Sequence, residues 1–128
     1  DLFAACGGTT FDARQIVLGG PMMGPSGANL DTPVVKGITG VVVLPDGQVK
    51  PTETYDCIKC GHCLDACPIF LNPQRMGLLA KNQRYEDMQA DYHLNDCMLC
   101  GCCSYVCPSN IPLSHLFGAS KAALRKST

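Results

Sequence analysis

The chain has 128 residues and a formal charge of −1 at neutral pH, with 10 lysines and arginines against 11 aspartates and glutamates. This length suits one domain, or one small domain attached to a piece of another, and excludes a large multidomain enzyme. The balanced charge excludes a polybasic surface for nucleic acid, and the longest apolar stretch, residues 38–44, is far short of the about 18–20 residues that span a bilayer.

The first part of the chain reads as a short helix followed by strands and turns. Residues 1–6 precede a pair of glycines, as the end of a helix does, and residues 15–18 and 39–44 are typical of short apolar strands. The glycine-rich segment 19–24 has a proline where a phosphate-binding loop needs its second glycine, so it indicates a structural turn. Residues 25–37 read as irregular.

Cysteine is the outlier of the composition, with 10 of 128 residues. Eight of these cysteines form two runs with the same spacing, C-x₂-C-x₂-C-x₃-C-P. The first run comprises Cys57, Cys60, Cys63 and Cys67, and the second comprises Cys97, Cys100, Cys103 and Cys107. Each cysteine of the second run follows its counterpart by 40 positions, and Gly61 and Gly101 keep the same offset, so the chain contains an internal repeat.

This spacing is typical of proteins that bind two [4Fe–4S] clusters, in which three cysteines of one run and the fourth cysteine of the other hold one cubane. Three closely spaced thiolates converge on three irons, and the fourth iron takes a ligand from elsewhere in the fold. We therefore predict a first cluster bound by Cys57, Cys60, Cys63 and Cys107, and a second cluster bound by Cys97, Cys100, Cys103 and Cys67. We expect the fourth cysteine of each run to lie in the opening turn of a helix.

Three other kinds of cysteine site fit the pattern less well. A structural zinc site uses two pairs of ligands, usually a dozen or more residues apart, and needs neither the third cysteine nor the cysteine-proline pair. Disulfides need an oxidising compartment, and a C-x-x-C redox pair explains only two of the eight cysteines. Cys6 and Cys102 lie outside the repeat, and we expect both to be ordinary packed thiols.

Helices are expected on both sides of the second cysteine run. Pro73 followed by apolar residues from Met76 to Ala80, and then the segment 85–88, predicts two short helices between the cysteine runs. Apolar residues at helical spacing after Pro112 predict a helix at the end of the chain. The methionines in these helices are expected to be core residues.

Several segments are more specific than the cysteine spacing alone. They are residues 16–24, 33–36, 40–44 and 57–63, and the second run, in which Cys-Gly-Cys-Cys-x-Tyr-Val-Cys-Pro-Ser precedes Ile-Pro-Leu. Together they resemble the C subunit of the Rnf electron transport complex, also called Rsx. The resemblance implies an α+β chain. Residues 1–52 would form a partial segment of an SLBB (β-grasp) domain with connecting strands, and residues 53–128 an α-helical ferredoxin-type domain with two [4Fe–4S] clusters.

The same resemblance implies an electron relay in the peripheral subunit of a membrane-bound, ion-translocating ferredoxin:NAD⁺ oxidoreductase. FMN and NADH would bind an upstream domain outside these 128 residues, so we expect no full turnover from this chain alone. The implied partners are the other Rnf subunits and ferredoxin-linked electron carriers, with no nucleic acid. The implied location is the cytoplasmic face of the bacterial inner membrane. A cobalamin-reductase-like microcompartment subunit and a structural zinc module remain open as alternatives.

The two cysteine loops differ in charge. The first loop contains Lys59 and His62, whereas the second contains Met98, Leu99 and Cys102. Because nearby positive charge stabilises the more negative, reduced state of a cluster, the sequence predicts the higher reduction potential for the first cluster.

Overall fold

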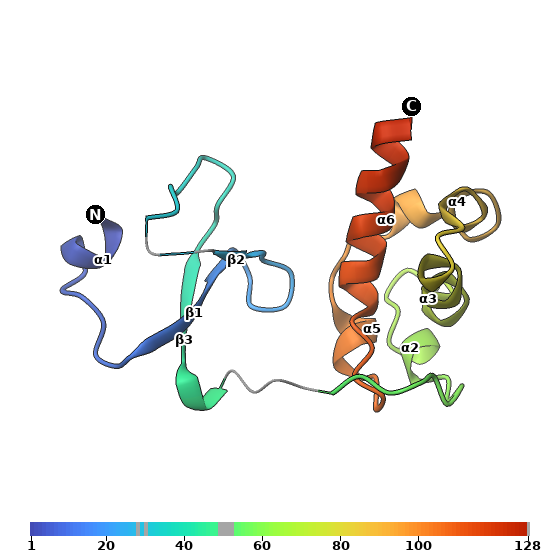
Figure 1. Ribbon diagram of the computed structural model, residues 1–128, viewed down its shortest axis with the longest axis horizontal. Coiled ribbons are helices and arrows are strands. Elements are labelled where there is room, and N and C mark those ends of the chain that lie inside the picture. The colour runs from blue at the N-terminus through green and yellow to red at the C-terminus, as the bar shows by residue number, and fades with distance from the viewer. Residues whose placement is uncertain (28, 30, 49–52, 128) are drawn as a thin grey trace. The chain divides into compact units, whose positions relative to one another are not determined.

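The computed structural model describes residues 1–27, 29, 31–48 and 53–127, and the chain divides into two compact units, Asp1–Pro51 and Thr52–Thr128 (Figure 1). Residue 52, the predicted end of the first domain, lies outside the described residues. A small antiparallel sheet in the first unit and helices in the second confirm the predicted α+β class. Within the described ranges, no helix is both long and apolar enough to cross a membrane.

The first unit is built on a three-stranded sheet. Its elements are the short helix α1 (Leu2–Ala5), the strands β1 (Ala13–Leu18), β2 (Ser26–Gly27) and β3 (Val41–Pro45), and the 3₁₀ turn η1 (Asp46–Gln48). β1 is the central strand and pairs antiparallel with both neighbours, with Ile16 opposite Val43 and Val17 opposite Val42. Ile16 and Val17 are the buried residues of this strand.

The structure confirms the two predicted strands and the turn between them, and adds one strand. β2 has only two residues, and its pairing with β1 is not visible in a segment that reads as irregular. In the turn after β1, a Cβ atom at Gly24 would lie 2.5 Å from the Leu18 carbonyl oxygen and 2.8 Å from the Val17 side chain. The glycine at this position therefore serves close packing, as a structural turn requires.

The second unit consists of helices. They are α2 (His62–Asp65), α3 (Pro73–Lys81), α4 (Tyr85–Tyr92), α5 (Cys102–Tyr105) and α6 (Leu113–Ser127), with the 3₁₀ turn η2 (Leu94–Asp96). The two helices predicted between the cysteine runs and the one after Pro112 are therefore confirmed. α3 starts as its sequence predicts, with Pro73 in the first turn and the Asn72 side chain accepting a hydrogen bond from the Arg75 amide at 3.1 Å.

The core of the second unit lies between α6 and the helices α3 and α4, which both contact it (Figure 1). Its fully buried members include Met76, Met88, Leu94 and Phe117, so the methionines are core residues, as predicted. Cys103 belongs to the same buried cluster of side chains. The core thus reaches directly to one of the cysteine runs.

The expected position of the fourth cysteine is wrong. The third cysteine of each run, Cys63 or Cys103, lies inside a four-residue helix, α2 or α5, whose C-cap is Ala66 or Val106. Cys67 and Cys107 therefore follow a helix and do not open one. Each helix is a single turn that begins one residue before the third cysteine and ends two residues before the fourth.

Candidate metal centres

The two cysteine loops follow the same backbone path. Gly61 and Gly101 occupy the residue before α2 and α5 with φ angles of 87° and 83°, a left-handed conformation that glycine adopts without strain. Lys59 and Leu99 stand two residues earlier with φ angles of 58° and 57°. Two left-handed residues in this order curl each loop tightly. The internal repeat of the sequence is therefore also a repeat of the structure.

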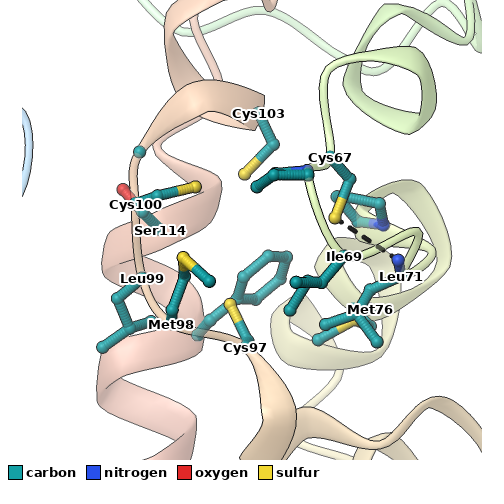
Figure 2. Close-up of a pocket in the computed structure, with 14 residues that line it drawn as sticks. Cys67, Ile69, Leu71, Met76, Cys97, Met98, Leu99, Cys100, Cys103 and Ser114 are labelled. Atoms are coloured by element: carbon teal, nitrogen blue, oxygen red, sulfur yellow. Dashed lines mark hydrogen bonds between the residues drawn. The ribbon is translucent and has the colours of Figure 1, made fainter.

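Four thiols line one pocket beside α6. They are Cys67, Cys97, Cys100 and Cys103, here called the second thiol group. Figure 2 shows their sulfur atoms pointing toward a common space from two loops that are distant in the sequence. Three of these cysteines come from the second run and one from the first, which is the combination expected of a cubane with crossed ligands.

The other four predicted ligands line a second pocket. Cys57, Cys60, Cys63 and Cys107, here called the first thiol group, lie together with residues of α3 such as Arg75 and Lys81. Cys57 and Cys60 are exposed, whereas no member of the second thiol group is. The structure thus brings together the same two sets of four cysteines that the repeat predicts as ligand sets.

Hydrogen bonds explain how the ends of the two runs meet. The Tyr55 amide donates to the Ser109 carbonyl oxygen at 2.9 Å, and the Ser109 hydroxyl donates to the Asp56 carbonyl oxygen at 2.9 Å. The Asn110 side-chain amide donates to the Glu53 carbonyl oxygen at 3.2 Å. These bonds fasten the segment before the first run to the segment after the second run. They hold the first cysteine of one run near the last cysteine of the other.

The charges around the thiols favour a metal cluster. Burial raises the pKa of the Cys63 and Cys97 thiols and raises that of Cys103 to about 11. Neighbouring cysteines of the same thiol group add to the increase by mutual repulsion. Half-buried thiolates gathered in this way are costly without a compensating cation, and an iron–sulfur core supplies positive charge to four thiolates at once.

The two pockets have different walls. The second thiol group is surrounded mainly by apolar side chains, among them Ile69, Met76 and Leu99 (Figure 2). Phe117 lines the same pocket. The first thiol group is lined by the cationic residues Lys59, Arg75 and Lys81 as well as by apolar ones. A negative charge added to the second pocket is therefore less well solvated than one added to the first.

Backbone amides also point at the sulfur atoms. The Leu71 amide donates to the Cys67 sulfur at 3.3 Å, as the dashed line in Figure 2 shows. A backbone hydrogen bond from Leu99 acts in the same way on Cys97 and opposes the effect of burial on its pKa. Such bonds orient the sulfur and stabilise its negative charge.

Among the described residues, no three His, Cys, Asp or Glu side chains converge on a position sized for a single metal ion. A [4Fe–4S] cubane needs a different arrangement, because each of its four irons binds one thiolate and the four thiolates surround the whole cube. The donor set of four thiolates in each pocket fits a [4Fe–4S] cluster.

The two cysteines outside the repeat behave differently from each other. Cys102 is partly buried, and a hydrogen bond with the Cys100 sulfur raises the pKa of its thiol, so it packs beside the second thiol group as expected. Cys6 is exposed at the end of α1, where no residue is buried, so the expectation of a packed thiol is wrong for Cys6.

Sequence reasoning missed the residues that hold the loops in place. These residues belong to no motif comparable to the cysteine runs. Each donates hydrogen bonds from its side chain to the backbone of a distant loop; they are Ser109, Asn110 and Lys121. One signal was available for Lys121, because it follows Lys81 by the same 40 positions that relate the two cysteine runs.

Comparisons with known proteins agree with these pockets. Residues 53–111 match the family model of the 4Fe-4S dicluster domain. Over 96 residues, the chain is 40% identical to the C subunit of the proton-translocating ferredoxin:NAD(+) oxidoreductase complex of Clostridium ljungdahlii. It is also similar to the C subunit of the ion-translocating oxidoreductase complex in two other bacteria, with 40% identity over 115 residues for Pasteurella multocida and 43% over 113 residues for Pectobacterium atrosepticum.

These alignments cover most of the chain but little of each relative. They include 75%, 88% and 87% of this chain, and 21%, 14% and 16% of the three relatives in the same order. The dicluster match implies two [4Fe–4S] clusters. Over most of its length, the chain is therefore homologous to the C subunit of the Rnf (Rsx) complex, and it carries a 4Fe-4S dicluster domain.

Proposed function

We propose that this chain relays electrons through two [4Fe–4S] clusters, held by the first and the second thiol group, within the C subunit of an ion-translocating ferredoxin:NAD⁺ oxidoreductase of the Rnf type. The observation that supports this most strongly is the gathering of eight repeat cysteines into two pockets of four, each with crossed membership. When bound, each cluster supplies one-electron redox chemistry between its 2+ and 1+ states.

The residues of the chain suit a relay better than a site that binds substrate. Four thiolates in each pocket satisfy four irons and leave no coordination position for a substrate. The protein has to hold the thiolates rigidly, limit the access of water and set the two potentials through nearby charges and hydrogen bonds. Both pockets lie within one helical unit that shares a core, which keeps the two thiol groups in a fixed relation.

The wider context of the proposal comes from the relatives. Their names describe the C subunits of ion- or proton-translocating oxidoreductase complexes, one of which is named a ferredoxin:NAD(+) oxidoreductase. We propose that the other subunits of such a complex and ferredoxin-linked carriers are the partners of this chain, at the cytoplasmic face of the membrane. FMN and NADH would be bound by other parts of the parent protein.

A stepwise anaerobic titration with dithionite tests the relay. We expect the chain to take up about two electrons, one per cluster, in two separate steps. The first electron is expected to enter the first cluster, because Lys59, Arg75 and Lys81 line its pocket and the second pocket is more apolar.

The titration is followed by EPR and by absorbance, so that each step has its own spectroscopic signal. Uptake of no electrons by an iron-loaded chain would contradict the relay. Equal potentials, or earlier reduction of the second cluster, would contradict the order of the two steps.

A further inference from the structure

Lys121 connects α6 to the loop that leads into the second cysteine run. Its ammonium group donates to the carbonyl oxygen of Cys97 at 2.6 Å and to that of Asn95 at 3.1 Å. These contacts span 24 and 26 residues of sequence, so they are tertiary contacts rather than local ones. The first loop is fastened in another way, by the hydrogen bonds of Ser109 and Asn110 described above.

The charge of Lys121 is not neutralised by a carboxylate. Within the part of the chain that the structure describes, no aspartate or glutamate oxygen lies within ion-pair distance of its ammonium group. The positive charge lies against the backbone of Cys97, which is one of the four cysteines of the second thiol group. A charge that stabilises a thiolate at this position also stabilises an additional electron on a cluster that the thiolate binds.

Lys81 is the counterpart of Lys121 in the internal repeat, 40 positions earlier. It lies at the end of α3, lines the pocket of the first thiol group and forms an ion pair with Asp56 at 3.9 Å. The side chains of Lys81 and Asp56 are 44% and 107% exposed, so water and the carboxylate both weaken the field of this lysine. Of the two lysines related by the repeat, Lys81 is therefore paired with a carboxylate and Lys121 is paired with none among the described residues.

We propose that Lys121 is a positioning residue for the second cluster, which holds the loop at residues 95–97 and raises the reduction potential of that cluster. This inference rests on the proposed function, because it assumes that the second thiol group binds a redox-active cluster. The step concerned is the uptake of one electron from dithionite by the oxidised cluster, with no bond broken and no proton transferred. Lys121 favours the product of this step because the reduced cluster carries one more negative charge.

The test is an EPR-monitored redox titration of the 128-residue chain and of three variants. Lys121→Met removes the charge and the donors but keeps an unbranched stem, Lys121→Arg keeps the charge, and Lys81→Met is the matched control in the other half of the repeat. We expect Lys121→Met to lower the equilibrium constant for reduction of the second cluster by about tenfold, which corresponds to about 59 mV for a one-electron couple. The potential of the first cluster is expected to stay unchanged.

Lys121→Arg should retain most of the potential of the second cluster. Lys81→Met should leave the potential of the second cluster unchanged. It should lower the equilibrium constant for reduction of the first cluster by clearly less than tenfold, because water and Asp56 weaken the field of Lys81. Iron analysis of each variant separates an electrostatic effect from loss of the cluster. Two unchanged potentials in an iron-loaded Lys121→Met variant would overturn the inference and leave the relay intact. Lack of any redox signal in the unaltered, iron-reconstituted chain would instead overturn the proposed function itself.

Discussion

Replacement of Cys107 by alanine is expected to remove the first cluster, although Cys107 belongs to the second cysteine run. Cys107 lines the same pocket as Cys57, Cys60 and Cys63, and its charge acts on the Cys63 thiol. A cubane that loses one of its four thiolates has an iron open to water and oxygen, so its occupancy falls steeply. Iron content should drop from about eight to about four atoms per chain, and one EPR signal should remain.

The reciprocal variant is Cys67→Ala, which changes a residue of the first run. We expect it to remove the second cluster and to leave the first, because Cys67 lines the pocket with Cys97, Cys100 and Cys103. The remaining EPR signal should therefore differ between the two variants. If each alanine instead removes the cluster of its own run, the crossed assignment of ligands is wrong.

Phe117→Ala is expected to destabilise the helical unit by about 3–5 kcal/mol, the usual cost of truncating a buried aromatic side chain. Phe117 is 1% exposed, lies in the core of the second unit and also lines the pocket of the second thiol group. Since domains of this size are stable by only about 5–15 kcal/mol, this loss is a large fraction of the total. It should also admit water and oxygen to the second pocket.

The matched control is Phe70→Ala, because Phe70 is 91% exposed and its ring packs against little of the protein. Thermal unfolding of the loaded proteins, followed by circular dichroism and by cluster absorbance, compares the two variants. We expect a large fall in Tm for Phe117→Ala, with earlier loss of the second cluster, and a change of a few degrees or less for Phe70→Ala. Similar Tm values for both variants would show that Phe117 does not support the core as its burial indicates.

Much of the fold could be predicted from the sequence because its signals are local. Pro73 and Asn72 mark the start of α3, and apolar spacing marks α6. β2 could not be predicted, since a strand of two residues has no pattern of its own and exists only through its pairing with β1. The same holds for α2 and α5, which are single helical turns around the third cysteine of each run and are too short to show a helical pattern in the sequence.

The candidate site could also be predicted only in part. The two predicted ligand sets follow from two cysteine runs of the same spacing, which are visible in the sequence. The residues that shape their surroundings, such as Ser109 and Lys121, act on loops more than 20 residues away and depend on tertiary structure. Because the potentials of clusters are set by these surroundings, sequence spacing predicts the number of clusters better than it predicts their properties.

The central claim is that the eight repeat cysteines hold two [4Fe–4S] clusters. The most direct test is anaerobic purification of the chain, followed by iron, sulfide and zinc analysis and by EPR of the dithionite-reduced protein. We predict about eight irons and eight sulfides per chain and two magnetically interacting S = 1/2 centres. Stoichiometric zinc with no EPR signal, even after anaerobic reconstitution with iron and sulfide, would contradict the account and identify a structural metal module.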